Sequence, residues 1–117
     1  MLVALNEQGE ITVLENSITK TTLQQMRTKT FYCPQCKQSL LLKAGTVKMP
    51  HFAHKANSEC INYFAEGESY PHLLGKSQLF DHFAKIYSVQ LEPYLPALKQ
   101  RPDLLIHMKN TYALEFQ

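Results

Sequence analysis

Short apolar runs fill the first part of the chain, and a longer stretch with helical spacing follows in the second part. Residues 1–5 and 11–14, MLVAL and ITVL, are strand-like runs separated by the turn-like segment NEQGE. Residues 17–29 place apolar side chains at helical spacing, and either Ser17 or Thr19 could cap that helix. The pattern therefore predicts two short strands followed by a short helix.

The second part carries a clearer helical signal. From Tyr70 to Tyr87 the apolar residues recur three and four positions apart, which is typical of one face of a helix. The segment VQLEPYLP then predicts a strand that ends at a proline. The last two apolar runs, DLLIHM and YALEFQ, are separated by a polar break and predict a β-hairpin.

Composition sets limits on the class of protein. The chain has 117 residues, of which 44% are hydrophobic and 19% charged, as in a globular domain or two small units. The formal net charge is +2, so charge alone does not indicate nucleic acid. The sequence contains no apolar run long enough to span a membrane and no secretory signal, so we expect a cytoplasmic protein without membrane association.

The three cysteines and two of the histidines follow a metal-binding pattern. Cys33 and Cys36 form a C-x2-C motif. Fourteen residues separate Cys36 from His51, which forms an H-x2-H pair with His54, and five residues separate His54 from Cys60. Zinc favours tetrahedral ligation by sulfur and nitrogen. We therefore predict a structural zinc site formed by Cys33, Cys36, His54 and Cys60, with His51 as the alternative histidine ligand.

Two other interpretations of the cysteines remain open. A thioredoxin-like redox motif would require the C-x2-C pair to open a helix, but the segment that follows, QSLLLK, is strand-like. The other interpretation is three unrelated buried cysteines with surface histidines.

A polar pattern marks the start of the long helix. Glu68, His72 and Lys76 are spaced four residues apart and would form one stripe if residues 68–86 were a single helix. Pro71 fits only within the first helical turn, which places Glu68 near the helix N-terminus. The alternative is an ordinary solvated helix face.

The C-terminal hairpin carries an acid on each strand. A two-residue turn would pair Leu104 with Glu115, whereas a three-residue loop would pair Leu105 with Glu115 and align Asp103, Glu115 and Gln117 on one face. Converging carboxylates suit a hard cation such as Mg²⁺. The alternative is a pair of edge-strand acids that keep the protein soluble.

Several segments in order resemble one family. The segments are CPQCK, KMPHFAHK, GESYPHLLGKSQLF, LEPYLPALKQRPDLLI and YALEFQ. They resemble the competence protein CoiA family, whose members act in bacterial natural transformation. The resemblance implies an α+β fold: residues 1–64 would form a zinc-ribbon-like unit, and residues 65–117 the first half of a nuclease-like core similar to the PD-(D/E)xK superfamily. Because members of the family are longer, we expect the chain to be an N-terminal fragment.

The resemblance also implies an active site with catalytic Mg²⁺ or Mn²⁺. The residues it assigns are the helix acid Glu68, the strand acids Asp103 and Glu115, and Gln117, with Lys76 and His72 as supporting groups from the helix. Gln117 stands where the superfamily usually has lysine. Glutamine can orient water by hydrogen bonding, but it carries no positive charge and cannot act as a base.

The leading functional hypothesis is metal-dependent cleavage of DNA, single-stranded or branched, during recombination of incoming DNA. A second is a non-catalytic DNA-binding scaffold that recruits recombination proteins. A third is a zinc-ribbon interaction unit with a surface around Phe52, Tyr63 and Phe64. Candidate phosphate contacts are Lys43, Lys48, Lys55, Lys76, Lys99 and Arg101. The sequence leaves the oligomeric state open, including self-association of the fragment.

Overall fold

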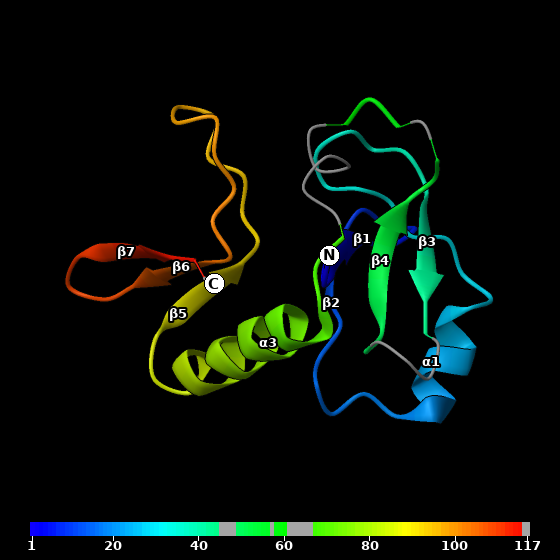
Figure 1. Cartoon of the computed structure of the whole chain (residues 1–117), viewed down its shortest axis with the longest axis horizontal. Helices are drawn as coiled ribbons and strands as arrows, with labels where there is room; N and C mark the ends of the chain where they lie inside the picture. Colours follow the sequence, from blue (N-terminus) through cyan, green and yellow to red (C-terminus); the bar gives the residue numbers. More distant parts are fainter. Residues whose placement is uncertain (45–48, 57, 61–66, 116–117) are drawn as a thin grey trace.

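The computed structural model describes residues 1–44, 49–56, 58–60 and 67–115. Its described elements form an α+β arrangement of small antiparallel sheets (Figure 1). The helices are α1 (Lys20–Met26) and α3 (Tyr70–Ala84). The strands are β1 (Val3–Leu5), β2 (Ile11–Val13), β3 (Leu40–Lys43), β4 (His51–His54), β5 (Ser88–Leu91), β6 (Leu104–His107) and β7 (Thr111–Leu114).

Three sheets are present in the described part of the chain. β1 pairs with β2, β3 pairs with β4, and the third sheet has the order β5-β6-β7. Figure 1 shows α3 between the two-stranded sheets and the three-stranded sheet. The paired strands are near neighbours in sequence, so each sheet forms from local segments, and α3 joins the N-terminal and C-terminal parts.

Capping residues set the starts of α1 and α3. Thr19 caps α1, because its hydroxyl accepts a hydrogen bond of 3.2 Å from the Thr22 amide. Ser69 caps α3 in the same way through the His72 amide, at 3.3 Å. The predicted helix over residues 68–86 is therefore too long at its start, since Glu68 precedes the cap.

The C-terminal hairpin has a register that differs from both predicted alternatives. Leu104 pairs with Leu114, so the loop consists of residues 108–110. The Met108 amide donates to the carbonyl oxygen of Asn110 at 2.9 Å, which places Met108 in the loop and not in the strand. Continuing this register by one pair sets Asp103 opposite Glu115.

One hydrophobic core runs through the N-terminal and C-terminal parts. Leu2 and Phe52 from the first part pack in the same buried cluster as Leu73 and Leu104 from the second. Phe52 is fully buried and its ring centroid lies 5.2 Å from that of Phe31. The hypothesis of an interaction surface around Phe52 is therefore wrong for that residue, and Tyr63 and Phe64 lie outside the described residues.

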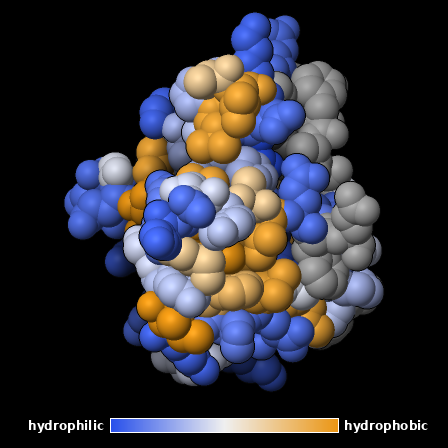
Figure 2. All heavy atoms as spheres, turned by 90° about the vertical axis from the view of Figure 1, so that its left-hand side faces the viewer, coloured by the Kyte–Doolittle hydropathy of each residue, from blue (hydrophilic) through white to orange (hydrophobic). Residues whose placement is uncertain are grey.

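Apolar side chains also reach the surface. Figure 2 shows them gathered on the side of the molecule that carries the three-stranded sheet. The exposed large hydrophobic residues of that part include Ile86, Met108 and Tyr112. Within the described ranges, no helix combines the length and the apolar character needed to cross a bilayer.

Phe52 should dominate the stability of the core. We expect Phe52→Ala to lower the free energy of unfolding by about 3–5 kcal/mol, because it removes a fully buried ring. Leu41→Ala is the matched control: Leu41 lies in the paired strand of the same hairpin and is 42% exposed, so its truncation should cost less than about 1 kcal/mol. Urea unfolding monitored by circular dichroism measures both, and equal losses would contradict this view of the core.

Candidate functional site

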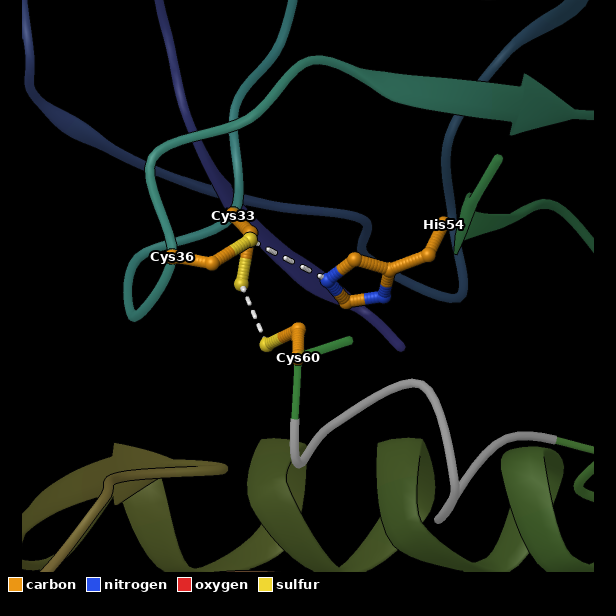
Figure 3. Close-up of side chains that lie close together, drawn as sticks. All are labelled: Cys33, Cys36, His54 and Cys60. Atoms are coloured by element: carbon orange, nitrogen blue, oxygen red, sulfur yellow. Dashed lines mark hydrogen bonds between the residues drawn. The ribbon is translucent and has the colours of Figure 1, made fainter. Parts of the chain in front are cut away.

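The cysteine and histidine side chains come together at one end of the β3–β4 hairpin. Cys33 and Cys36 lie in a tight turn before β3, closed by the Lys37 amide donating to the Cys33 carbonyl oxygen at 2.9 Å. His54 is the last residue of β4 and pairs with Leu40 at the start of β3, next to that turn. Cys60 approaches from the segment after β4 (Figure 3).

The geometry of this cluster fits a tetrahedral metal ion. The Cys33 and Cys60 sulfurs lie 3.8 Å apart, and Cys36 Sγ lies 3.6 Å from His54 Nε2 (Figure 3). Zinc with ordinary bond lengths gives sulfur–sulfur edges of about 3.8 Å and sulfur–nitrogen edges of about 3.6 Å. All four ligand atoms lie within 4.8 Å of one another. The cluster can therefore hold a metal such as zinc.

The structure brings His54 into the cluster and leaves His51 outside it. His51 Nδ1 lies 3.0 Å from the carbonyl oxygen of Met49, to which it can donate a hydrogen bond. The C-x2-C motif leads into strand β3 and does not open a helix, so the setting that a thioredoxin-like redox motif requires is not present.

A second cluster lies where α3 meets the C-terminal sheet. Glu68 Oε2 is 2.5 Å from Lys76 Nζ and 3.0 Å from His72 Nε2. Asp103 Oδ1 is 3.5 Å from His72 Nε2 and 3.8 Å from Lys76 Nζ. Glu68, His72 and Asp103 form a second group of ligand atoms within 4.8 Å of one another. We refer to these three residues with Lys76 as the acidic cluster.

The surroundings of Lys76 and Arg101 do not fit the prediction that these cations contact phosphate. Lys76 is only 2% exposed, so the alternative of a solvated helix face is wrong for this residue. Arg101 Nη2 lies 2.8 Å from Glu92 Oε1. Both cations are held in ion pairs, which makes them poor candidates for exposed phosphate contacts. Lys48, another such candidate, lies outside the described residues.

Glu92 is the site residue that sequence reasoning missed. Its buried carboxylate lies 2.5 Å from Lys76 Nζ, and it accepts hydrogen bonds from the amides of Leu2 and Val3 at 3.0–3.2 Å. In the sequence, Glu92 is a single acid beside a proline. No motif or regular spacing links it to another acid, so the sequence does not indicate a role for it.

Burial and ion pairing act against each other on the pKa values of this network. Burial raises the pKa of Glu92, but Lys76 and Arg101 outweigh it and lower the pKa to about 2. Burial also raises the pKa of Glu68, but Lys76 outweighs this effect and the pKa lies below its ordinary value. Burial lowers the pKa of Lys76, but Glu92 and Glu68 raise it above its ordinary value. Burial lowers the pKa of the Met1 amine, which lies 3.4 Å from Glu68 Oε1.

The remaining predicted residues are Glu115 and Gln117. Glu115 is exposed and stands opposite Asp103 in the continued register, outside the group formed by Glu68, His72 and Asp103. Gln117 lies outside the described residues. The assignment of Glu115 and Gln117 to an active site stays a prediction.

Comparisons with known proteins match both parts of the chain. The family model for the N-terminal domain of competence protein CoiA matches residues 15–63, and the model for its nuclease-like domain matches residues 68–117. Competence protein CoiA of Bacillus subtilis (strain 168) is 41% identical over 96 residues. That alignment covers 80% of this chain and 26% of the Bacillus protein, so the chain corresponds to about a quarter of this relative. No solved structure matches the chain. The chain belongs to the CoiA family of competence proteins.

Zinc content should distinguish the two histidines. We expect His54→Gln and Cys60→Ser to lose most of the bound zinc, because each removes one of four ligands. His51→Gln, in the same strand, is the matched control and should retain it. Metal analysis by mass spectrometry after dialysis measures the content of each variant. Loss of zinc from His51→Gln with retention by His54→Gln would reverse the assignment.

Glu92 should make stability depend on acidic pH. Because its pKa is lowered from 4.5 to about 2, its stabilisation is complete above about pH 4.5 and is lost as the pH falls towards 2. We expect Glu92→Gln to lower the free energy of unfolding by about 3 kcal/mol at pH 7, with the difference from wild type shrinking in that acidic window. Chemical unfolding across pH measures it, with the exposed Glu15→Gln as control. A difference that does not vary with pH would contradict the role of the charge.

Proposed function

We propose that the chain is part of a nuclease-like DNA-processing protein that promotes natural transformation by metal-dependent hydrolysis of phosphodiester bonds. The observation that carries this proposal is the convergence of Glu68, His72 and Asp103 within the segment that matches the nuclease-like family model. Single-stranded or branched DNA is the proposed substrate, and recombination proteins are the proposed partners.

The acidic cluster offers oxygen and nitrogen ligands for Mg²⁺ or Mn²⁺. Glu68, His72 and Asp103 would hold the ion, with Glu115 as a further carboxylate from the neighbouring strand. A bound ion of this kind polarises a phosphate and lowers the pKa of an attacking water. The mixture of carboxylate and imidazole ligands favours Mn²⁺, since Mg²⁺ prefers oxygen ligands alone.

Lys76 of α3 would supply part of the role that the usual strand lysine has. Lys76 keeps a positive charge beside Glu68 and Asp103, where it can offset charge that develops on a phosphate. His72 Nε2 faces both acids, so it would hold the ion together with them. The neutral Gln117 would then serve to orient water.

The Cys/His cluster has a separate, structural role in this proposal. Four protein ligands leave no open coordination position for water, so a zinc ion there would be structural. The strands of the N-terminal part have only three or four residues each, and a bound metal would contribute folding free energy to them. The result would be a zinc-ribbon-like unit packed against the nuclease-like part.

A non-catalytic DNA-binding or adaptor scaffold is the second candidate. The observation that favours it is the position of Lys76, which lies 2.5 Å from both Glu68 and Glu92 and so compensates their charges without a metal. The absence of a lysine at position 117 points the same way. Such a protein would recruit recombination proteins to the incoming strand.

DNA cleavage by the full-length protein tests the proposal. We expect Mn²⁺-dependent cleavage of labelled single-stranded or branched DNA that falls roughly 100-fold or more in Asp103→Asn and Glu68→Gln, because each removes a metal ligand. Asp81→Asn, which changes an acid of α3 outside the acidic cluster, is the matched control and should cleave normally. DNA binding without cleavage, unchanged in both ligand variants, would support the scaffold instead.

A further inference from the structure

Glu92 occupies an unusual position for a carboxylate. It follows β5 directly, and its side chain is 2% exposed. Its Oε2 atom faces the Lys76 ammonium, and its Oε1 atom faces the Arg101 guanidinium. The amides of Leu2 and Val3, about ninety residues away in sequence, donate to the same carboxylate. The proposed mechanism does not use Glu92 as a ligand.

We propose that Glu92 is a positioning residue: it engages the Lys76 ammonium, so that less of its charge acts on Glu68 and Asp103, and it ties the acidic cluster to the N-terminal part of the chain. This inference rests on the proposed function, because it assigns Glu92 a role in how the acidic cluster takes up a divalent cation.

The first step of the argument is the sharing of Lys76. Its ammonium lies between Glu92 and Glu68, with Asp103 at 3.8 Å. If Glu92 lost its charge, the positive charge of Lys76 would act fully on Glu68 and Asp103. A divalent cation at those two acids would then meet stronger repulsion and fewer available lone pairs. The charge of Glu92 therefore favours metal binding by engaging Lys76.

The second step is what fixes Glu92 itself. Leu2 and Val3 hold its carboxylate, and these residues are in turn attached to β4, because the Phe52 amide donates to the carbonyl oxygen of Met1 at 2.7 Å. Phe52 is two residues from His54 of the Cys/His cluster. Hydrogen bonds and ion pairs, joined by the backbone from Met1 to Leu2 and from Phe52 to His54, thus connect the two clusters.

The backbone of Glu92 supports a specialised role. Its φ of +54° lies in the left-handed region, which non-glycine residues seldom adopt, and Pro93 follows directly. Such a conformation persists where surrounding contacts fix it. One of those contacts is the Glu92 amide, which donates to the carbonyl oxygen of Asp103 at 2.8 Å. The same residue therefore meets the acidic cluster through its side chain and its backbone.

Mn²⁺ affinity of the full-length, zinc-loaded protein tests this inference by isothermal titration calorimetry. We expect Glu92→Gln to weaken Mn²⁺ binding by about 10–100-fold, the effect typical of a residue that supports metal ligands. Glu15→Gln, an exposed acid of the N-terminal part, is the control and should bind as wild type does. Arg101→Gln, which removes a cation from Glu92 but leaves Lys76 in place, should not weaken binding.

A double variant separates positioning through Lys76 from general loosening of the fold. In a Lys76→Met background, Glu92→Gln should change Mn²⁺ affinity by no more than about twofold, since the group it positions is gone. Weakening of the same size with and without Lys76 would overturn the proposal, as would wild-type affinity in a folded Glu92→Gln protein. Should Glu92→Gln not fold, Glu92→Asp withdraws the carboxylate by one methylene. Weaker Mn²⁺ binding is then expected, and wild-type affinity overturns the proposal.

A readout without divalent metal keeps this inference apart from the proposed function. Hydrogen exchange by nuclear magnetic resonance should show slow exchange at the Lys76 ammonium in the wild-type protein and fast exchange in Glu92→Gln. If the wild-type protein bound no Mn²⁺, the proposal of metal-dependent hydrolysis would be wrong. The exchange measurement would still test the contact between Glu92 and Lys76. Unchanged exchange in Glu92→Gln would overturn the positioning role on its own.

Discussion

The packing of the N-terminal and C-terminal parts depends on the ion pairs and hydrogen bonds that the buried carboxylate of Glu92 receives. A carboxylate withdrawn from water is costly unless charges and hydrogen bonds replace its solvation. Here Lys76 and Arg101 supply the charge and the amides of Leu2 and Val3 supply the hydrogen bonds. These donors come from the start of the chain, from α3 and from the segment before β6. Satisfying one carboxylate therefore fixes the mutual position of those three parts.

The same constraint explains why the acidic cluster forms at all. Glu68 and Asp103 would repel each other if they were brought together alone. Lys76 enters between them from α3, and Glu92 holds it there. The resulting site is nearly charge-balanced before any ion binds. A divalent cation therefore gains less binding free energy here than at an uncompensated pair of acids. For this reason the same cluster is compatible with both proposed functions, hydrolysis with a bound metal and DNA binding without one.

The sequence predicted what depends on local spacing. The C-x2-C motif with His54 and Cys60 indicated a set of four ligands that the structure brings together, because short hairpins and turns place such residues near one another. The sequence favoured His54 and kept His51 as the alternative, and the pairing of His54 with Leu40 explains why His54 is the histidine that lies beside the C-x2-C turn. The hairpin register differed from both predicted registers because Met108 belongs to the loop.

Glu92 could not have been found from the sequence, because its partners are set by tertiary packing. Leu2 and Lys76 lie far from it along the chain, and nothing in the segment VQLEPYLP distinguishes a buried acid from a surface one. The hydrophobic core likewise runs across the predicted boundary near residue 64, with Leu2 and Leu73 in one cluster. Because the two parts share one core, a metal bound at the Cys/His cluster can affect the position of side chains in the distant acidic cluster. If the Cys/His cluster orders β4, then β4 orders residues 1–3, and those residues hold the carboxylate that positions Lys76.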